Sequence, residues 1–114
     1  MTVFDWPGLG GRARILVEDM ASRGLSGYFT ATEIDEQWSI CCGAGRHDFV
    51  DPSWVRDELR LAGLKRGLRR LHRAEFDLVR RRTGLTRAVL YRIPTSEEAA
   101  QVAEKVSPMR RGAA

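Results

Sequence analysis

The sequence predicts one mainly α-helical domain that carries a small antiparallel β-hairpin. The chain has 114 residues, which is the length of a single domain with one hydrophobic core. Apolar residues recur at helical spacing in several stretches. Near residue 80 the pattern changes to the alternation of strands, and Pro94 ends it. These three observations together favour a helical domain with one hairpin.

The first two segments are predicted from glycine, proline and apolar spacing. Residues 1–11 contain four Gly or Pro residues and predict an irregular N-terminal arm. Residues 12–23 then place apolar side chains at i, i+3, i+4 and i+7, which indicates an amphipathic helix with Gly24 at its C-terminal end. The apolar positions are Ala13, Leu16, Val17 and Met20.

Two further helices are predicted from their start signals. Thr30 and Glu33 have the spacing of a capping box, so we expect a short helix over residues 31–38. Asp51 followed by Pro52 is typical of an N-cap and a first helical position, and predicts a helix over residues 51–61. Between them, residues 39–50 are expected to form a loop, in which residues 49–50 could be a short strand.

The next segment combines leucines with many bases. Leu64, Leu68 and Leu71 recur at i, i+4 and i+7, while Lys and Arg occupy the positions between them. This pattern predicts a basic amphipathic helix over residues 64–74. Gly67 weakens it by about 1 kcal/mol relative to alanine.

The C-terminal third is predicted to contain a hairpin and a final helix. Residues 76–82 and 87–93 are expected to be its two arms, joined at a turn signalled by Thr83 and Gly84. Thr95 and Glu98 form a second capping box and start a helix over residues 95–107. The tail, 108–114, is expected to be mobile.

The positive charge is concentrated in one third of the chain. Residues 1–55 hold four arginines and eight acidic residues, whereas residues 56–92 hold twelve bases and four acidic residues. Residues 93–114 hold three of each. Such clustering is typical of a surface that binds a polyanion.

The order of helix, helix, basic helix and basic hairpin from residue 50 to residue 93 resembles the winged helix-turn-helix family. The resemblance implies a winged helix-turn-helix domain over residues 12–94, with a recognition helix at 64–74 in the major groove and an Arg-rich wing at 76–93. It implies double-stranded DNA as the partner. The residues expected to contact DNA are Lys65, Arg66, Arg69, Arg70, Arg73, Arg80, Arg81, Arg82 and Arg87.

A second register fits the same family. In it, residues 31–38 are the positioning helix, residues 39–51 an enlarged turn, and residues 51–62 the recognition helix, with Trp54 and Arg56 near the groove. The first register is preferred because the bases lie there.

The expected role is sequence-specific transcriptional regulation. We expect a homodimer, because one short helix gives modest specificity and two half-sites multiply it. Either helix 12–23 or the face of residues 99–106 could form the contact. The alternative is a protein–protein interaction module on the same scaffold.

Several other classes of function are not favoured. No set of nucleophile, base and stabiliser can be assembled, so we expect neither an enzyme nor a cofactor. Cys41, Cys42 and His47 match no standard zinc spacing, and no metal is expected. The chain contains no apolar run of about 18 residues and no secretory signal at its start, so we expect a cytoplasmic location and no membrane.

Overall fold

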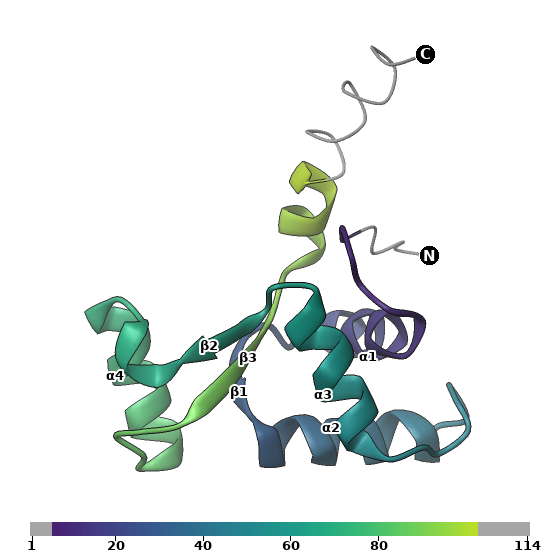
Figure 1. Ribbon diagram of the computed structural model, residues 1–114, viewed down its shortest axis with the longest axis horizontal. Coiled ribbons are helices and arrows are strands. Elements are labelled where there is room, and N and C mark those ends of the chain that lie inside the picture. The colour runs from purple at the N-terminus through teal and green to yellow at the C-terminus, as the bar shows by residue number, and fades with distance from the viewer. Residues whose placement is uncertain (1–5, 103–114) are drawn as a thin grey trace.

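The computed structural model describes residues 6–102, in which helices surround a three-stranded antiparallel sheet (Figure 1). The elements in chain order are α1 (Gly11–Ser22), β1 (Gly27–Thr30), α2 (Ala31–Gly43), α3 (Pro52–Leu61), β2 (Lys65–Gly67), the 3₁₀ turn η1 (Leu68–Arg70), α4 (Arg73–Thr83) and β3 (Val89–Ile93). One more helix covers residues 96–102. None of the helices in this part of the chain is long and apolar enough to cross a bilayer.

Strand β3 occupies the centre of the sheet. It pairs antiparallel with β1 on one edge and with β2 on the other, so that Tyr91 lies opposite both Phe29 and Lys65. Successive side chains of a strand point to opposite faces of the sheet. Tyr91 and Ile93 therefore point to one face and Leu90 to the other, where they join two separate hydrophobic cores.

The main core lies between the sheet and the three helices α1, α2 and α3. Trp38 of α2 is completely buried in it, and its indole Nε1 donates a hydrogen bond to the Val50 carbonyl oxygen over 3.0 Å. This bond ties α2 to the segment that leads into α3. Fully buried aliphatic residues complete the core, among them Leu16, Val17, Met20, Ile34, Val55 and Leu59.

A second, smaller core lies on the other face of the sheet. It is formed by Leu68 of η1, Val79 of α4 and Leu90 of β3. Partly buried side chains surround it, namely Tyr28, Leu71, Phe76 and Ala88. This cluster is what holds α4 against the sheet.

The predicted starts of α1, α2 and α3 are confirmed. Helix α1 covers nearly the predicted range, and α2 begins with the expected capping box, in which Thr30 and Glu33 bond each other's backbone nitrogens. In α3, Asp51 accepts a hydrogen bond from the Ser53 nitrogen and Pro52 begins the helix. However, α2 continues to Gly43, and residues 49–50 form no strand.

The basic helix predicted at residues 64–74 is wrong. Residues 65–67 form β2 and residues 68–70 form η1, so the leucine spacing has another cause. Leu64 belongs to the main core and Leu68 to the second core, so the two side chains share no helix face. Gly63 has a φ of 77°, which glycine adopts without strain, and it ends α3 before a helix could continue.

The hairpin predicted over residues 76–93 is wrong in its first arm. Residues 76–82 lie inside α4, and only the second arm forms a strand, β3. The strand that precedes β3 in the chain and pairs antiparallel with it is β2, so α4 is inserted between these two strands. Gly84, with a φ of 73°, is the C-cap of α4 and not a hairpin turn. A helix C-terminus and a hairpin turn both favour glycine at this position, so Gly84 alone could not distinguish a helix from a hairpin arm.

The remaining expectations fall partly inside the described residues. Strand β1 was not predicted, because its four residues pair with residues of β3 that lie 60 or more positions away. The helix expected at 95–107 is present over 96–102, with Thr95 and Glu98 bonded as in a capping box. Residues 103–107, the tail 108–114 and residues 1–5 of the expected arm lie outside the described range.

We predict that Leu90→Ala destabilises the protein by about 2–5 kcal/mol, because it opens a cavity in the second core. Val89→Ala is the matched control, since Val89 is 48% exposed and Leu90 is fully buried. The control is expected to change stability by less than about 0.5 kcal/mol. Urea unfolding measures both. Equal effects would contradict the position of β3 between two cores.

Candidate nucleic-acid interface

Residues 65–88 form a basic lobe at one end of the molecule. The lobe consists of β2, η1, α4 and the loop that leads to β3. Figure 1 shows α4 at the end of the sheet away from α1 and α3. Nine bases and two acidic residues fall within this range, so the lobe concentrates the positive charge of the chain.

Most bases of the lobe are exposed and have no acidic partner among residues 6–102. They are spread over the strand, the 3₁₀ turn, both ends of α4 and the loop. These eight residues are Lys65, Arg66, Arg69, Arg70, Arg73, Arg80, Arg81 and Arg87. All eight were expected from the sequence to contact DNA, and the structure brings them into one lobe without a recognition helix.

Six arginines outside the lobe are ion-paired with acidic residues. Arg56 of α3 is bonded to Asp35 of α2 over 2.8 Å, and Arg60 is bonded to Asp57 over 2.7 Å. Ion pairs of the same kind hold Arg12, Arg23, Arg46 and Arg92. Acidic residues of the body, which is the described part of the chain outside residues 65–88, thus pair with these six arginines, whereas the lobe stays charged.

Within the lobe, Arg82 differs from the other arginines. Its guanidinium forms two hydrogen bonds of 3.0 Å to the two carboxylate oxygens of Glu33, and a third of 2.6 Å to the Tyr28 carbonyl oxygen. It also lies over the Phe29 ring at 5.2 Å. Arg82 is therefore the base of the lobe that is ion-paired with the acidic half of the chain.

The carboxylate of Glu33 is stabilised in its charged form. Partial burial raises the pKa of Glu33, but hydrogen bonds from Arg82 and from the Thr30 nitrogen outweigh it and leave the pKa below its usual value. The same side chain thus completes the capping box of α2 and binds α4.

The exposed face of α3 has two large apolar side chains among the polar residues Ser53, Asp57 and Arg60. Trp54 is 52% exposed and Leu61 is 67% exposed, and both lie on the same side of the helix at i and i+7. Asp57 lies between them, and the Arg12 guanidinium covers the Trp54 ring at 5.0 Å. The second register placed Trp54 and Arg56 near a groove; Trp54 is exposed as that requires, whereas Arg56 is occupied by Asp35.

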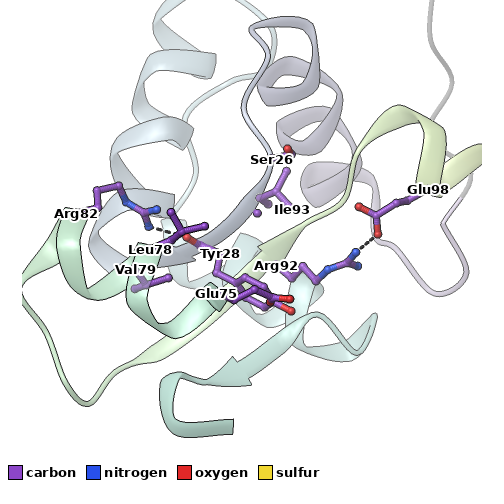
Figure 2. Close-up of a pocket in the computed structure, with 10 residues that line it drawn as sticks. Ser26, Tyr28, Glu75, Leu78, Val79, Arg82, Arg92, Ile93 and Glu98 are labelled. Carbon is purple, nitrogen blue, oxygen red and sulfur yellow. Dashed lines mark hydrogen bonds and ion pairs between the residues drawn. The ribbon is translucent and has the colours of Figure 1, made fainter. Parts of the chain in front are cut away.

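A pocket of about 370 Å³ lies between α4, the sheet and the C-terminal helix (Figure 2). Leu78, Val79 and Ile93 form its apolar wall. Arg92 and Glu98 form an ion pair at one side. The volume lies in the range that small ligands occupy. Sequence reasoning missed this pocket, because its walls come from four separate segments.

The hydroxyl of Tyr28 and the carboxylate of Glu75 meet in the same pocket. Burial of the Tyr28 ring raises the pKa of Tyr28, and its hydrogen bond to Glu75 raises it further. The phenol therefore stays protonated and donates to the carboxylate, which fixes α4 to β1 at a second point.

The two cysteines are free and unequal. Cys41 is buried in the main core, whereas Cys42 is partly exposed. Burial, followed by the nearby Asp19 charge, raises the pKa of the Cys41 thiol to about 11. The ring of His47 lies 5.3 Å from that of Trp38. Over residues 6–102 no group of three or more His, Cys, Asp or Glu side chains is placed to hold a metal ion.

We compared the chain with known protein families, with curated proteins and with solved structures, and none of the three comparisons found a match. The site is therefore interpreted from its geometry and charge.

We predict that iodoacetamide at pH 8 modifies Cys42 faster than Cys41, because the reactive form is the thiolate and Cys41 is both buried and high in pKa. Mass spectrometry of Cys41→Ser and Cys42→Ser variants checks this. The Cys41→Ser variant should be labelled at the natural rate, and the Cys42→Ser variant only after unfolding in urea. Equal labelling of the two folded variants would contradict the burial of Cys41.

Proposed function

We propose that the chain is a winged helix-turn-helix protein that binds double-stranded DNA through the basic lobe. The observation that carries this proposal is the group of eight exposed bases in residues 65–87 that have no acidic partner within the described range 6–102. Like charges gathered on one lobe repel one another, which opposes folding unless a polyanion neutralises them. Arginine also has the planar fork that binds phosphate oxygens in pairs.

The topology supports the winged helix-turn-helix part of the proposal. A helix, a short strand and two helices precede an antiparallel strand pair, and the last strand lies in the middle of the sheet. In this arrangement α2 and α3 are the helix pair, as in the second register, and the basic lobe takes the place of the wing. The wing is then unusually large, because it includes η1 and α4.

The charge distribution supports different roles for the basic lobe and for α3 in DNA binding. The lobe has the free bases for contacts to the phosphate backbone, which give affinity without sequence information. The exposed side of α3 offers Ser53, Asp57 and Arg60 as polar groups for base edges, and Asp57 and Arg60 are already paired with each other. One copy would therefore read little sequence, and we propose that a homodimer on two half-sites supplies the specificity of a transcriptional regulator.

A second candidate function is protein binding through α3. The observation that favours it is the exposed Trp54 and Leu61, together with arginines that are already paired on the same helix. Exposed large apolar groups on one helix face are typical of a docking surface. Under this alternative, charge reversal in the lobe leaves partner binding intact.

We predict that the protein binds a fluorescent duplex of about 25 base pairs, with an affinity that falls linearly with salt on a double-logarithmic plot. Each phosphate contact contributes about 0.9 to the slope. Arg69→Gln with Arg70→Gln should lower the slope by about two, and Arg69→Glu with Arg70→Glu should abolish binding. Fluorescence anisotropy measures both.

The control is Arg46→Gln, which removes one positive charge from the body where the lobe variant removes two from the lobe. Arg46 is ion-paired with Asp19 in the body, so this variant should leave the slope unchanged. A response that is flat in salt, or equal losses in the lobe variants and in the control, would argue for the protein-binding candidate.

A further inference from the structure

We propose that Arg82 positions the basic lobe on the body of the protein and contacts no phosphate of the DNA. The proposal rests on the proposed DNA binding and separates Arg82 from Arg80 and Arg81, its neighbours in the sequence. A free guanidinium serves a polyanion, whereas the guanidinium of Arg82 is already occupied by Glu33 and by the Tyr28 carbonyl.

Helix phase explains why three consecutive arginines have two roles. Glu75, Leu78, Val79 and Arg82 stand at i, i+3, i+4 and i+7, which places them on one side of α4. Figure 2 shows these four side chains around the pocket, on the side of α4 that faces the sheet. Arg73, Asp77, Arg80 and Arg81 share the opposite side, which faces away from the body.

The bonds of Arg82 connect segments that are distant in the sequence. Glu33 lies 49 positions away at the first turn of α2, and Tyr28 lies 54 positions away in β1. The guanidinium therefore joins α4 to a strand and to a second helix. Because both carboxylate oxygens of Glu33 take part, the pair fixes an orientation as well as a distance.

The packing of the lobe leaves a role for such a bond beside the Tyr28–Glu75 hydrogen bond. The second core that holds α4 contains only three fully buried side chains, namely Leu68, Val79 and Leu90. Beside it the pocket leaves α4 partly out of contact with the sheet. Few buried contacts allow a segment to open locally, and apparent affinity falls with the fraction of molecules in the binding-competent arrangement.

Substitution of Glu33 distinguishes a positioning role from a simple charge effect, because the two explanations predict opposite changes in DNA affinity. Removing a negative charge near a DNA-binding surface ordinarily strengthens DNA binding. If Glu33 acts by holding Arg82, its loss must weaken binding. Glu33→Gln is suitable because the amide oxygen can take the place of Oε1 and still accept from the Thr30 nitrogen, so that the capping box of α2 is retained. The amide nitrogen then takes the place of Oε2 and cannot accept from Arg82 Nε, and the negative charge that pairs with Arg82 is lost.

The experiment measures duplex affinity against salt for Arg82→Gln, Glu33→Gln and the double variant, with Arg81→Gln and Asp77→Asn as controls. We expect Arg82→Gln and Glu33→Gln each to weaken binding about fivefold with an unchanged slope. The double variant should be no weaker than either single variant, because both single variants break the same ion pair. Arg81→Gln should lower the slope by about one, and Asp77→Asn should not weaken binding.

Amide hydrogen exchange without DNA gives a readout that does not depend on the proposed function. Exchange over residues 73–83 should be faster in Arg82→Gln and Glu33→Gln than in Arg81→Gln. If Arg82→Gln lowers the salt slope as Arg81→Gln does and Glu33→Gln tightens binding, Arg82 contacts a phosphate and the proposal is overturned. If the natural chain binds no duplex, the DNA proposal fails, and unchanged exchange in both variants would then overturn the positioning role as well.

Discussion

The structure depends on the hydrogen bonding of β3 along both of its edges. This strand is the element that both cores share, since Tyr91 and Ile93 enter the main core while Leu90 enters the second core. Its pairing partners β1 and β2 are four and three residues long, too short to form a stable sheet by themselves. The body and the basic lobe therefore both pack against β3, and this strand fixes their positions relative to each other.

The distribution of charge follows the same division. Acidic residues of the first half are used within the body, where Asp19 holds Arg23 and Arg46. The lobe contains few acids of its own, and within the part of the chain that the structure describes a single long-range ion pair, between Arg82 and Glu33, joins it to the acidic part. Isolated surface ion pairs add little stability. The Arg82 guanidinium, however, also has a third hydrogen bond and lies over an aromatic ring, so its orientation is fixed. The fold thus separates arginines that build the protein from arginines that remain available.

Features determined within one helical turn could be predicted from the sequence. The capping box at Thr30 and Glu33 and the start at Asp51 and Pro52 are of this kind. Features determined at a distance could not. Strand β1 exists because of β3, and the regular spacing of Leu64 and Leu68 arose from two cores, not from one helix face. The segment that holds the free bases was found from charge alone, whereas the partner of Arg82 lies 49 positions away and left no local pattern.

The insertion of α4 has a consequence for how such a domain can diversify. Gly67 and Val89 are direct partners in the sheet, so the chain leaves and returns at adjacent points. A two-residue turn could close this gap without moving β2 or β3. The whole segment between Gly67 and Val89 can therefore be exchanged for another segment while the rest of the domain is unchanged. Without this segment, Leu90 and Tyr28 would be exposed to solvent, so a polar residue would be required at position 90. The main core on the other face of the sheet would be unchanged.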